Sequence, residues 1–391
     1  MTTVLFLPLL QLPSGHHRAA EALAEGLRSI DRAVKCEKIE LLSSRLGAKE
    51  QWISRLYLRC IRHAPKAYSA AYRRSVLRPS SEPPSFSLYE RLFGGHLKQL
   101  IRRLKPALIV CTHAFPSHLL DLLKQRGEID VPVINVYTDY FVHNLWGKTA
   151  IDGHFVGHPA MKEALVRKGV AIEQITVTGI PVHPAFAARQ PAPPAMRARY
   201  IGLISGGSLG LGDWEQLFSK ISPNDPVDYY VLCGTNEQLY ERLKKKNHPR
   251  LLPLRYISSP AAMSALYDEV DFVLTKPGGV TLSECLRKRK PAFIYAMLPG
   301  QEEINFRLLC DDGLIFDFRH WRRLPSLSKA IVSTLHSPAL ARCLAKIDDY
   351  HRTLSPTDPA LVIYERFLAA SPINKGRSWF DNVKPHHSFR I

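Results

Sequence analysis

Short apolar runs alternate with helical segments along almost the whole chain, and this alternation constrains the fold more than any other feature. Each run has about four to seven residues and is nearly continuously apolar, which is typical of parallel strands buried on both faces. Repeated strand–helix alternation predicts doubly wound α/β sheets, here two of them. We expect strands at residues 4–10, 107–112, 133–137, 153–156, 175–178, 201–204, 229–233, 252–256, 272–274 and 292–295.

The length of the chain and a proline-dense stretch divide it into two domains. A chain of 391 residues is longer than the roughly 250–300 residues at which a single hydrophobic core stops growing. Prolines are concentrated between Pro181 and Pro194, which suits a linker rather than a central strand or a helix interior. We expect domains at 1–190 and 197–355 facing a central cleft, a linker near 184–198, a helix at 356–370 that returns to the first domain, and a loose basic tail at 371–391.

The charge and the cysteines limit the classes of partner and compartment. Lys and Arg number 53 against 35 Asp and Glu, a net charge of +18, which attracts nucleic acid, anionic lipid or acidic ligands. The sequence contains no recognisable nucleic-acid reader, so we expect no nucleic-acid partner. Seven scattered cysteines without a CxxC pair indicate reduced thiols and no structural metal. No apolar run approaches the roughly 20 residues that span a bilayer, which predicts a cytoplasmic protein able to rest on a membrane surface.

Two glycine-rich turns follow predicted strands of the second half. Ser205-Gly206-Gly207-Ser208 comes directly after the strand at 201–204, and Thr275-Lys276-Pro277-Gly278-Gly279 follows the strand at 272–274. Open α/β sheets bind ligands at the carboxyl ends of their strands, and glycine lets the backbone approach an anion closely. Each turn alone is as readily a ligand-free connection, but the pair at neighbouring strands predicts a diphosphate site. Neither matches a P-loop or GxGxxG.

The carboxylate of Glu284 has two readings, because it lies three residues after Thr281. In the first, Thr281 is the N-cap of a helix and Glu284 completes a capping box. In the second, Glu284 accepts hydrogen bonds from two ribose hydroxyls. The spacing leaves both readings open.

Polar side chains also follow the strands of the first half. His16 opens the first helix, where it either faces the cleft as a proton acceptor or caps the turn. Asp139 follows the strand at 133–137 and either contacts substrate or acts as an N-cap. His143 and Trp146 lie in the following loop, which could close over a sugar or an acyl chain.

A basic segment with interleaved aromatic residues occupies positions 51–81, which contain seven Arg or Lys and no Asp or Glu. Trp52, Arg55, Arg59 and Arg62 exemplify its composition. Such a segment suits docking on anionic lipid, although a solvated basic face over an ordinary core has the same composition.

Taken in order, these motifs resemble the monogalactosyldiacylglycerol synthases and the bacterial processive diacylglycerol glucosyltransferases, which are GT-B enzymes of the family 28 type. More distantly, the chain is similar to the glycosyltransferase that adds N-acetylglucosamine to the peptidoglycan lipid precursor. The matching segments run from about residue 4 to 310 and are Gly15-His16-x-x-Ala19-Ala20, Thr138-Asp139 with His143 and Trp146, Val177-Thr178-Gly179-Ile180-Pro181-Val182, Gly206-Gly207-Ser208, Cys233-Gly234-x-Asn236, Thr275-Lys276-Pro277-Gly278-Gly279-x-Thr281-x-x-Glu284 and Pro299-Gly300-Gln301-Glu302-x-x-Asn305.

The resemblance implies a GT-B fold of two Rossmann-like domains and inverting transfer from a UDP-sugar without an obligatory cofactor or metal. It implies catalytic roles for His16 and Asp139 without saying which of them is the base. It places acceptor and membrane contacts at His143, Trp146, Trp52, Arg55, Arg59 and Arg62. It assigns the UDP-sugar to Gly206, Gly207, Ser208, Gly234, Asn236, Lys276, Gly278, Gly279, Thr281, Glu284, Gln301 and Glu302.

The resulting functional expectation is transfer of a hexose from a UDP-sugar to a hydroxyl of a lipid such as diacylglycerol. The expected location is the inner face of the cell membrane, where the protein would be peripheral and would contact anionic lipid. A transferase for a soluble acceptor and a UDP-sugar epimerase-like enzyme are the alternatives. The first turn is less glycine-rich than in many relatives, and Lys288-Arg289-Lys290 is unusually basic. The sugar, the acceptor, processivity and the oligomeric state stay open.

Overall fold

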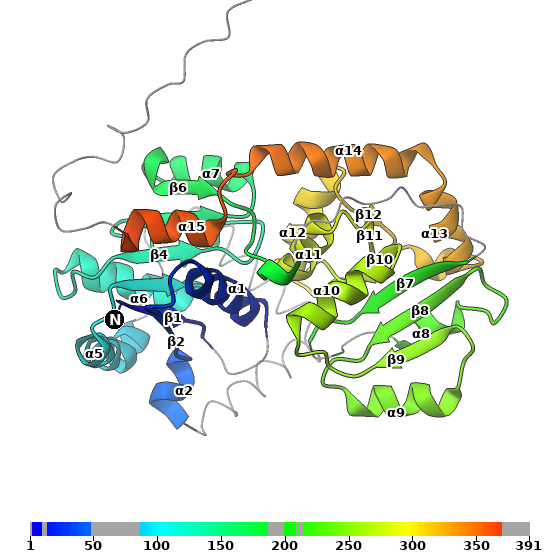
Figure 1. The fold of residues 1–391 in the computed structure, drawn as a ribbon, viewed down its shortest axis with the longest axis horizontal. Coiled ribbons are helices and arrows are strands. Elements are labelled where there is room, and N and C mark those ends of the chain that lie inside the picture. The colour runs from blue at the N-terminus through cyan, green and yellow to red at the C-terminus, as the bar shows by residue number, and fades with distance from the viewer. Residues whose placement is uncertain are drawn as a thin grey trace, which may run out of the picture.

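Two parallel β-sheets with flanking helices lie side by side in the computed structural model (Figure 1). The structure describes residues 2–9, 14–47, 87–186, 199–208, 210 and 214–369. The predicted linker residues 187–198 and the predicted tail at 371–391 lie outside this part of the chain. We call the half that contains the first sheet the first lobe and the half that contains the second sheet the second lobe. The architecture confirms the predicted two-domain α/β fold.

Each sheet has six strands, and every neighbouring pair is parallel. The strand order is β2-β1-β3-β4-β5-β6 in the first sheet and β12-β11-β10-β7-β8-β9 in the second. The strands are β1 (Thr2–Leu7), β2 (Val34–Lys38), β3 (Leu108–Cys111), β4 (Val133–Val136), β5 (Gly153–Val156), β6 (Ile175–Val177), β7 (Tyr200–Ser205), β8 (Val227–Leu232), β9 (Leu251–Leu254), β10 (Phe272–Thr275), β11 (Ala292–Ile294) and β12 (Phe316–Asp317).

Both faces of each sheet are covered, because successive side chains of a strand point to opposite faces. In β1, Val4 and Phe6 belong to one core cluster, whereas Leu5 and Leu7 belong to another. The second sheet divides its residues between two clusters in the same way. This two-sided burial is the reason why the strands are nearly continuous apolar runs.

The ten predicted strands are all present, but the sequence analysis missed β2 and β12. Both strands lie at sheet edges and therefore pair on one side only. β2 reads Val-Lys-Cys-Glu-Lys, and β12 has two partly exposed residues. Neither strand is an apolar run, because neither is buried on both faces.

Three helices of the second half begin with a side-chain cap followed by proline. Ser259, Ser337 and Asp358 each accept a hydrogen bond from a backbone amide in the first helical turn, and proline at the next position has the helical φ already. The helices are α1 (Gly15–Ile30), α2 (Leu41–Leu46), α5 (Ser87–Leu104), α6 (Ala114–Gln125), α7 (Pro159–Val166), α8 (Trp214–Ser219), α9 (Glu237–Lys246), α10 (Pro260–Glu269), α11 (Gly279–Arg287), α12 (Gln301–Asp311), α13 (Leu327–Leu335), α14 (Pro338–Thr353) and α15 (Pro359–Ile363), with a π-helical turn at Tyr364–Leu368 and 3₁₀ turns at Ile172–Gln174, Pro184–Phe186 and Trp321–Arg323.

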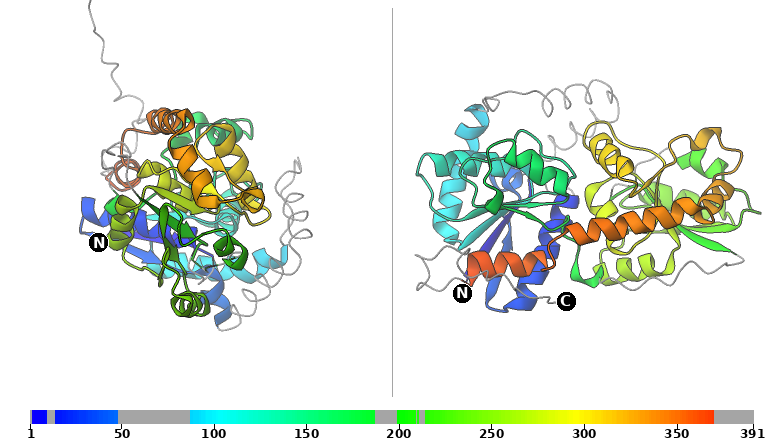
Figure 2. Two further views of the ribbon diagram at one scale, coloured as in Figure 1. Left: turned by 90° about the vertical axis from the view of Figure 1, so that its right-hand side faces the viewer. Right: turned by 90° about the horizontal axis from the view of Figure 1, so that it is seen from above.

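The C-terminal helices cross back from the second lobe to the first. Figure 2 shows the long α14 (orange) running toward the first lobe, with α15 (orange-red) lying on that lobe. Ala360 packs closely on Gly26 of α1, and the Tyr364 hydroxyl donates to Asp31 at 3.1 Å. The two lobes are therefore tied together at a second point besides the segment between β6 and β7. Within the described residues, no helix is both long and apolar enough to cross a bilayer.

Candidate active site

The two lobes meet at the carboxyl ends of their central strands. An added Cβ at Gly279, the first residue of α11, would lie 2.1 Å from the carbonyl oxygen of Thr138, which follows β4. An added Cβ at Gly15, at the start of α1, would lie 3.1 Å from Val280 Cγ2. The residues that follow β1 and β4 therefore face those that follow β10, which is the arrangement expected of a ligand site in α/β proteins.

His16 is held by one ring nitrogen. Its Nδ1 lies 2.7 Å from the carbonyl oxygen of Thr112 and 2.8 Å from the Thr138 hydroxyl. A carbonyl oxygen can only accept, so Nδ1 carries the hydrogen and Nε2 of the neutral ring keeps its lone pair. Burial lowers the pKa of His16, although the charge of Asp139 and the Thr112 carbonyl oppose the shift. The imidazole is therefore neutral near pH 7 and can accept a proton at Nε2.

Asp139 lies beside this histidine and is bonded to the second lobe. Its Oδ1 accepts a hydrogen bond from Asn305 Nδ2 of α12 at 2.9 Å. Burial raises the pKa of Asp139, opposed by the nearby His16 and by the Asn305 bond. No helix begins after Asp139, so the alternative reading of this residue as an N-cap is wrong.

The first glycine turn has an open surface and a packed underside. Gly207 has a φ of +77°, and nothing lies within 4 Å of an added Cβ there. Gly234 and Asn236 support the turn from the β8–α9 connection. An added Cβ at Gly234 would lie 2.4 Å from the Ser208 carbonyl oxygen, and Asn236 Nδ2 donates to the Gly210 carbonyl at 3.3 Å. Gly234 and Asn236 therefore pack beneath the turn. Direct contact between these two residues and the UDP-sugar stays a prediction.

The second glycine turn places a buried ammonium next to the first. Where β10 pairs with β7, Leu274 lies opposite Ile204. Lys276 comes two residues after Leu274, and Gly206 comes two residues after Ile204, so the two occupy equivalent positions beyond the ends of neighbouring strands. Lys276 is 8% exposed, and burial lowers its pKa against the opposing effect of Glu302. Glu302 follows Gln301, the first residue of α12, and burial raises its pKa. The register therefore places Lys276 and the first glycine turn at the ends of neighbouring strands, on the same edge of the sheet.

Glu284 joins the two lobes instead of completing a capping box. The N-cap of α11 is Gly278, and Thr281 lies inside the helix, so the capping-box reading is wrong. Glu284 is 5% exposed. Its Oε1 accepts from Arg18 of α1 at 3.2 Å and its Oε2 from the Tyr267 hydroxyl at 2.9 Å. Burial raises the pKa of Glu284, opposed mainly by Arg18. A carboxylate has about four lone-pair positions, so acceptor capacity remains for a ribose.

The loop after β4 is packed into the first lobe. Trp146 is 6% exposed, and its ring centroid lies 4.5 Å from that of Tyr137 with an interplanar angle of 45°. This corrects the expectation of a side chain free to close over an acceptor, because the indole belongs to the core of the lobe. His143 Nδ1 accepts from the backbone amide of Leu145 at 2.9 Å, and burial lowers its pKa to about 4. The remaining predicted acceptor residues, Trp52, Arg55, Arg59 and Arg62, lie outside the described residues.

Sequence reasoning assigned no role to three residues of this site, Arg18, His113 and Asn305, although Asn305 stands in one of the matching segments. His113 follows β3 as His16 follows β1, and its ring lies edge-on to His16 at 4.7 Å. The position after a central parallel strand was a usable signal for His113. Arg18 and Asn305 lie inside helices, where the sequence does not show which lobe they contact.

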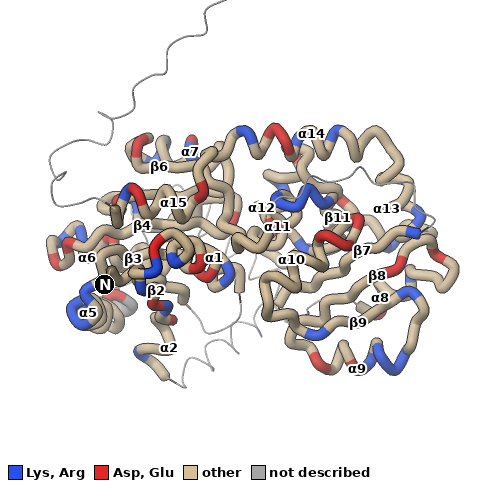
Figure 3. The backbone as a smooth tube through the Cα atoms, in the orientation of Figure 1, with Lys and Arg blue, Asp and Glu red and all other residues tan. Residues whose placement is uncertain are grey.

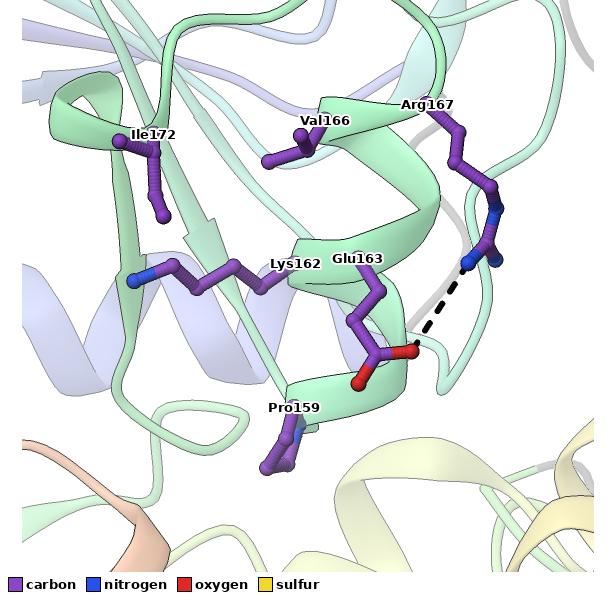
Figure 4. A pocket seen from close by; sticks show the side chains of 6 residues that line it. All are labelled: Pro159, Lys162, Glu163, Val166, Arg167 and Ile172. Carbon is purple, nitrogen blue, oxygen red and sulfur yellow. Dashed lines mark ion pairs between the residues drawn. The ribbon is translucent and has the colours of Figure 1, made fainter.

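A hollow of about 390 Å³ on the surface of α7 is separate from this cleft. Figure 4 shows its lining, in which Glu163 forms an ion pair with Arg167 at 3.8 Å. None of the predicted site residues that the structure describes is among its lining residues, which are Pro159, Lys162, Glu163, Val166, Arg167 and Ile172.

Comparisons with known proteins agree with the fold. Residues 16–182 match the family model "Monogalactosyldiacylglycerol (MGDG) synthase". The uncharacterized glycosyltransferase YkoN of Bacillus subtilis (strain 168) is 39% identical over 321 residues, which cover 82% of this chain and 85% of that protein. The processive diacylglycerol beta-glucosyltransferase of the same organism is 29% identical over 279 residues, or 68% of this chain and 70% of that protein.

Among solved structures, MurG of Acinetobacter baumannii superposes with a TM-score of 0.58 at 14% identity, covering 94% of this chain and 99% of that one. Two parallel α/β lobes that meet at the ends of their central strands are the GT-B fold. The chain belongs to the family of monogalactosyldiacylglycerol synthases and processive diacylglycerol glucosyltransferases, and it is a hexosyltransferase.

Proposed function

We propose that the enzyme transfers a hexose from a UDP-sugar to a hydroxyl of a diacylglycerol-type lipid, with inversion at the anomeric carbon. The observation that carries the proposal is the placement of His16. Its Nδ1 is bonded to a carbonyl, so its Nε2 is free to accept a proton where the first lobe faces the glycine turns of the second. The family membership and the acceptor named for the diacylglycerol glucosyltransferase support a lipid acceptor.

The second lobe would bind the donor without an obligatory cofactor. Amides at Gly206, Gly207 and Ser208 would meet the diphosphate, and Lys276 would add positive charge next to it. Glu284 would accept from the ribose hydroxyls. The remaining residues assigned to the nucleotide and sugar are Gly278, Gly279, Thr281, Gln301 and Glu302.

The reaction would then be a single displacement. The acceptor hydroxyl attacks the anomeric carbon from the face opposite UDP, and the bond between that carbon and the phosphate oxygen breaks. The electron pair leaves with UDP, where amides and Lys276 stabilise the charge. The hydroxyl proton passes to Nε2 of His16, and the Asp139 carboxylate stabilises the imidazolium. Contact between the lobes orients both substrates and excludes water.

The lipid would be reached by a peripheral protein at the inner face of the cell membrane. The segment at 51–81, which lies outside the described residues, would contact anionic lipid through its seven Arg or Lys residues. Within the described part, α5 follows this segment and exposes Arg91, Leu92, Arg102 and Arg103; blue segments mark Lys and Arg along its tube (Figure 3). An exposed apolar residue among arginines suits contact with anionic lipid.

A donor and acceptor screen tests the proposal. The protein is incubated with UDP-glucose, UDP-galactose, UDP-glucuronate or UDP-N-acetylglucosamine, with and without diacylglycerol vesicles. Released UDP and the mass of the lipid product are then measured. We expect UDP release that requires vesicles and a lipid that gains one hexosyl residue. A sugar epimer formed without acceptor, or UDP release that needs only a soluble acceptor, would contradict the proposal.

A further inference from the structure

One amide side chain joins the predicted catalytic carboxylate to the opposite lobe. Asn305 of α12 is 0% exposed. Its Nδ2 donates to Asp139 Oδ1 at 2.9 Å and to the Pro277 carbonyl at 3.2 Å, and its Oδ1 accepts from the Tyr140 backbone amide at 2.8 Å. Both amide hydrogens and the amide oxygen are thereby used, each on a different residue.

Two of these bonds cross between lobes and the third does not. Asp139 and Tyr140 belong to the first lobe, whereas Asn305 and Pro277 belong to the second. Separation of the lobes breaks the bonds to Asp139 and Tyr140 together and leaves only the bond to Pro277. The hydrogen bond that orients the Asp139 carboxylate therefore exists only when the lobes are in contact.

We propose that Asn305 is a positioning residue that fixes the Asp139 carboxylate beside His16 only when the lobes are closed, so that the proton-accepting pair is complete only in the closed enzyme. This inference rests on the proposed roles of His16 and Asp139 in transfer. Asn305 acts through Asp139 and is not itself assigned to either substrate. An enzyme of this design performs proton transfer after both substrates are enclosed, which limits hydrolysis of the donor by water.

The charged groups around His16 and Asp139 determine how the pH dependence of kcat should change. The charge of His16 from α1 lowers the pKa of Asp139. Asp139 in turn raises the pKa values of Glu302 of α12 and of the Tyr140 hydroxyl.

His16 also has two histidine neighbours, His17 and His113. Both have pKa values below the ordinary value because they are buried, so they add no positive charge at neutral pH.

The sign of the effect follows from the Asn305 hydrogen bond. This bond lowers the pKa of Asp139, so its removal raises that pKa. Transfer needs Asp139 ionised and His16 neutral. The acid limb of the kcat profile therefore moves to higher pH when Asn305 can no longer donate.

The test uses the full chain with Asn305→Asp and Asn305→Ala. Aspartate has nearly the same shape and can still accept from the Tyr140 amide, but its carboxylate cannot donate to Asp139. With UDP-sugar and diacylglycerol vesicles between about pH 5 and 9, we expect a loss in kcat of about 10-fold or more at neutral pH. We expect KM for the donor to stay within about threefold of wild type and the acid limb to shift upward by about one pH unit. Asn305→Ala keeps the test valid if the aspartate variant does not fold.

Asn135→Asp is the matched control. Asn135 is also 0% exposed, and its Nδ2 donates to the Gly147 carbonyl at 2.9 Å within the first lobe. Asn135→Asp buries a new carboxylate, as Asn305→Asp does, but this carboxylate does not contact Asp139. We expect it to lower the melting temperature and to leave the acid limb in place. An unshifted acid limb in both Asn305 variants, or an equal shift in Asn135→Asp, overturns the inference.

Asp139→Asn separates failure of the inference from failure of the proposed function. If Asp139→Asn lowers turnover by about 10-fold or more but the Asn305 variants keep the wild-type profile, the inference alone is wrong. If Asp139→Asn leaves turnover unchanged, the proposed role of Asp139 and the inference both fail. Adding Asn305→Asp to Asp139→Asn should cause no further change in the pH profile, because the group that Asn305 positions is then already lost.

Discussion

Gly279→Ala tests whether contact between the lobes is needed for turnover. The added methyl carbon would lie 2.1 Å from the Thr138 carbonyl oxygen and 3.0 Å from Ile180 Cδ1, both in the first lobe. Neither a backbone oxygen nor α11 can give way cheaply, so the lobes must separate locally by about 1 Å to restore van der Waals distance. Thr138 also contacts His16 through its hydroxyl, so this separation disturbs the proton acceptor.

A misplacement of about 1 Å in reacting groups costs about 10²-fold in rate, or about 3 kcal/mol in the activation free energy. We therefore expect kcat to fall about 100-fold in Gly279→Ala. The fold of each lobe should be unaffected, because alanine is at least as favourable as glycine in a helix. UDP affinity should change less than about threefold, because the methyl group points at the first lobe and not into the second.

The assay combines turnover, calorimetric UDP binding and thermal unfolding. Gly95→Ala controls for a Gly-to-Ala change in a helix, because an added Cβ there meets nothing within 4 Å. It should retain the wild-type melting temperature and UDP affinity. Turnover of Gly279→Ala within twofold of wild type would refute the reasoning. A loss in UDP affinity as large as the loss in kcat would show instead that the methyl group obstructs the nucleotide.

Three further predictions address the donor, the base and the membrane. Glu284→Ala should weaken UDP binding by about 10-fold or more, because two ribose hydroxyls lose a charged acceptor; an unchanged calorimetric Kd, equal to that of the exposed control Glu269→Ala, would reject this role. His16→Ala should lower kcat about 10²-fold or more with UDP affinity intact, and near-normal turnover would assign the base elsewhere. Since burial lowers the pKa of His16 and raises that of Asp139, wild-type kcat should fall on the acid side as these two groups take up protons. Binding to anionic vesicles should weaken steeply with added salt, and salt-independent binding would argue against docking through 51–81.

The central strands could be predicted because their physical cause is visible in the sequence. Burial on both faces requires apolar runs, and the ten strands with such runs were found. β2 has one buried residue and β12 has none, so neither leaves such a pattern, whereas the other two edge strands, β6 and β9, have apolar runs and were found. The turns beside the cleft were predictable for a related reason, since polar residues directly after buried parallel strands all lie at one end of a sheet.

The contacts between the lobes could not be predicted from the sequence. Arg18 pairs with Glu284 across 266 positions, and Asn305 bonds Asp139 across 166. Such pairs depend on how the two sheets pack against each other. The periodicity of apolar residues within a segment carries no information about that packing. The capping-box reading failed because α11 begins at Gly279, two residues before the expected start at Thr281.

The position of bound UDP tests the central claim most directly. A crystal structure of the enzyme soaked with UDP should place the diphosphate against residues 205–208 beside Lys276, with the ribose at Glu284. UDP bound anywhere other than beside the turns at 205–208 and 276–284 would contradict the assignment of the donor site and the mechanism built on it.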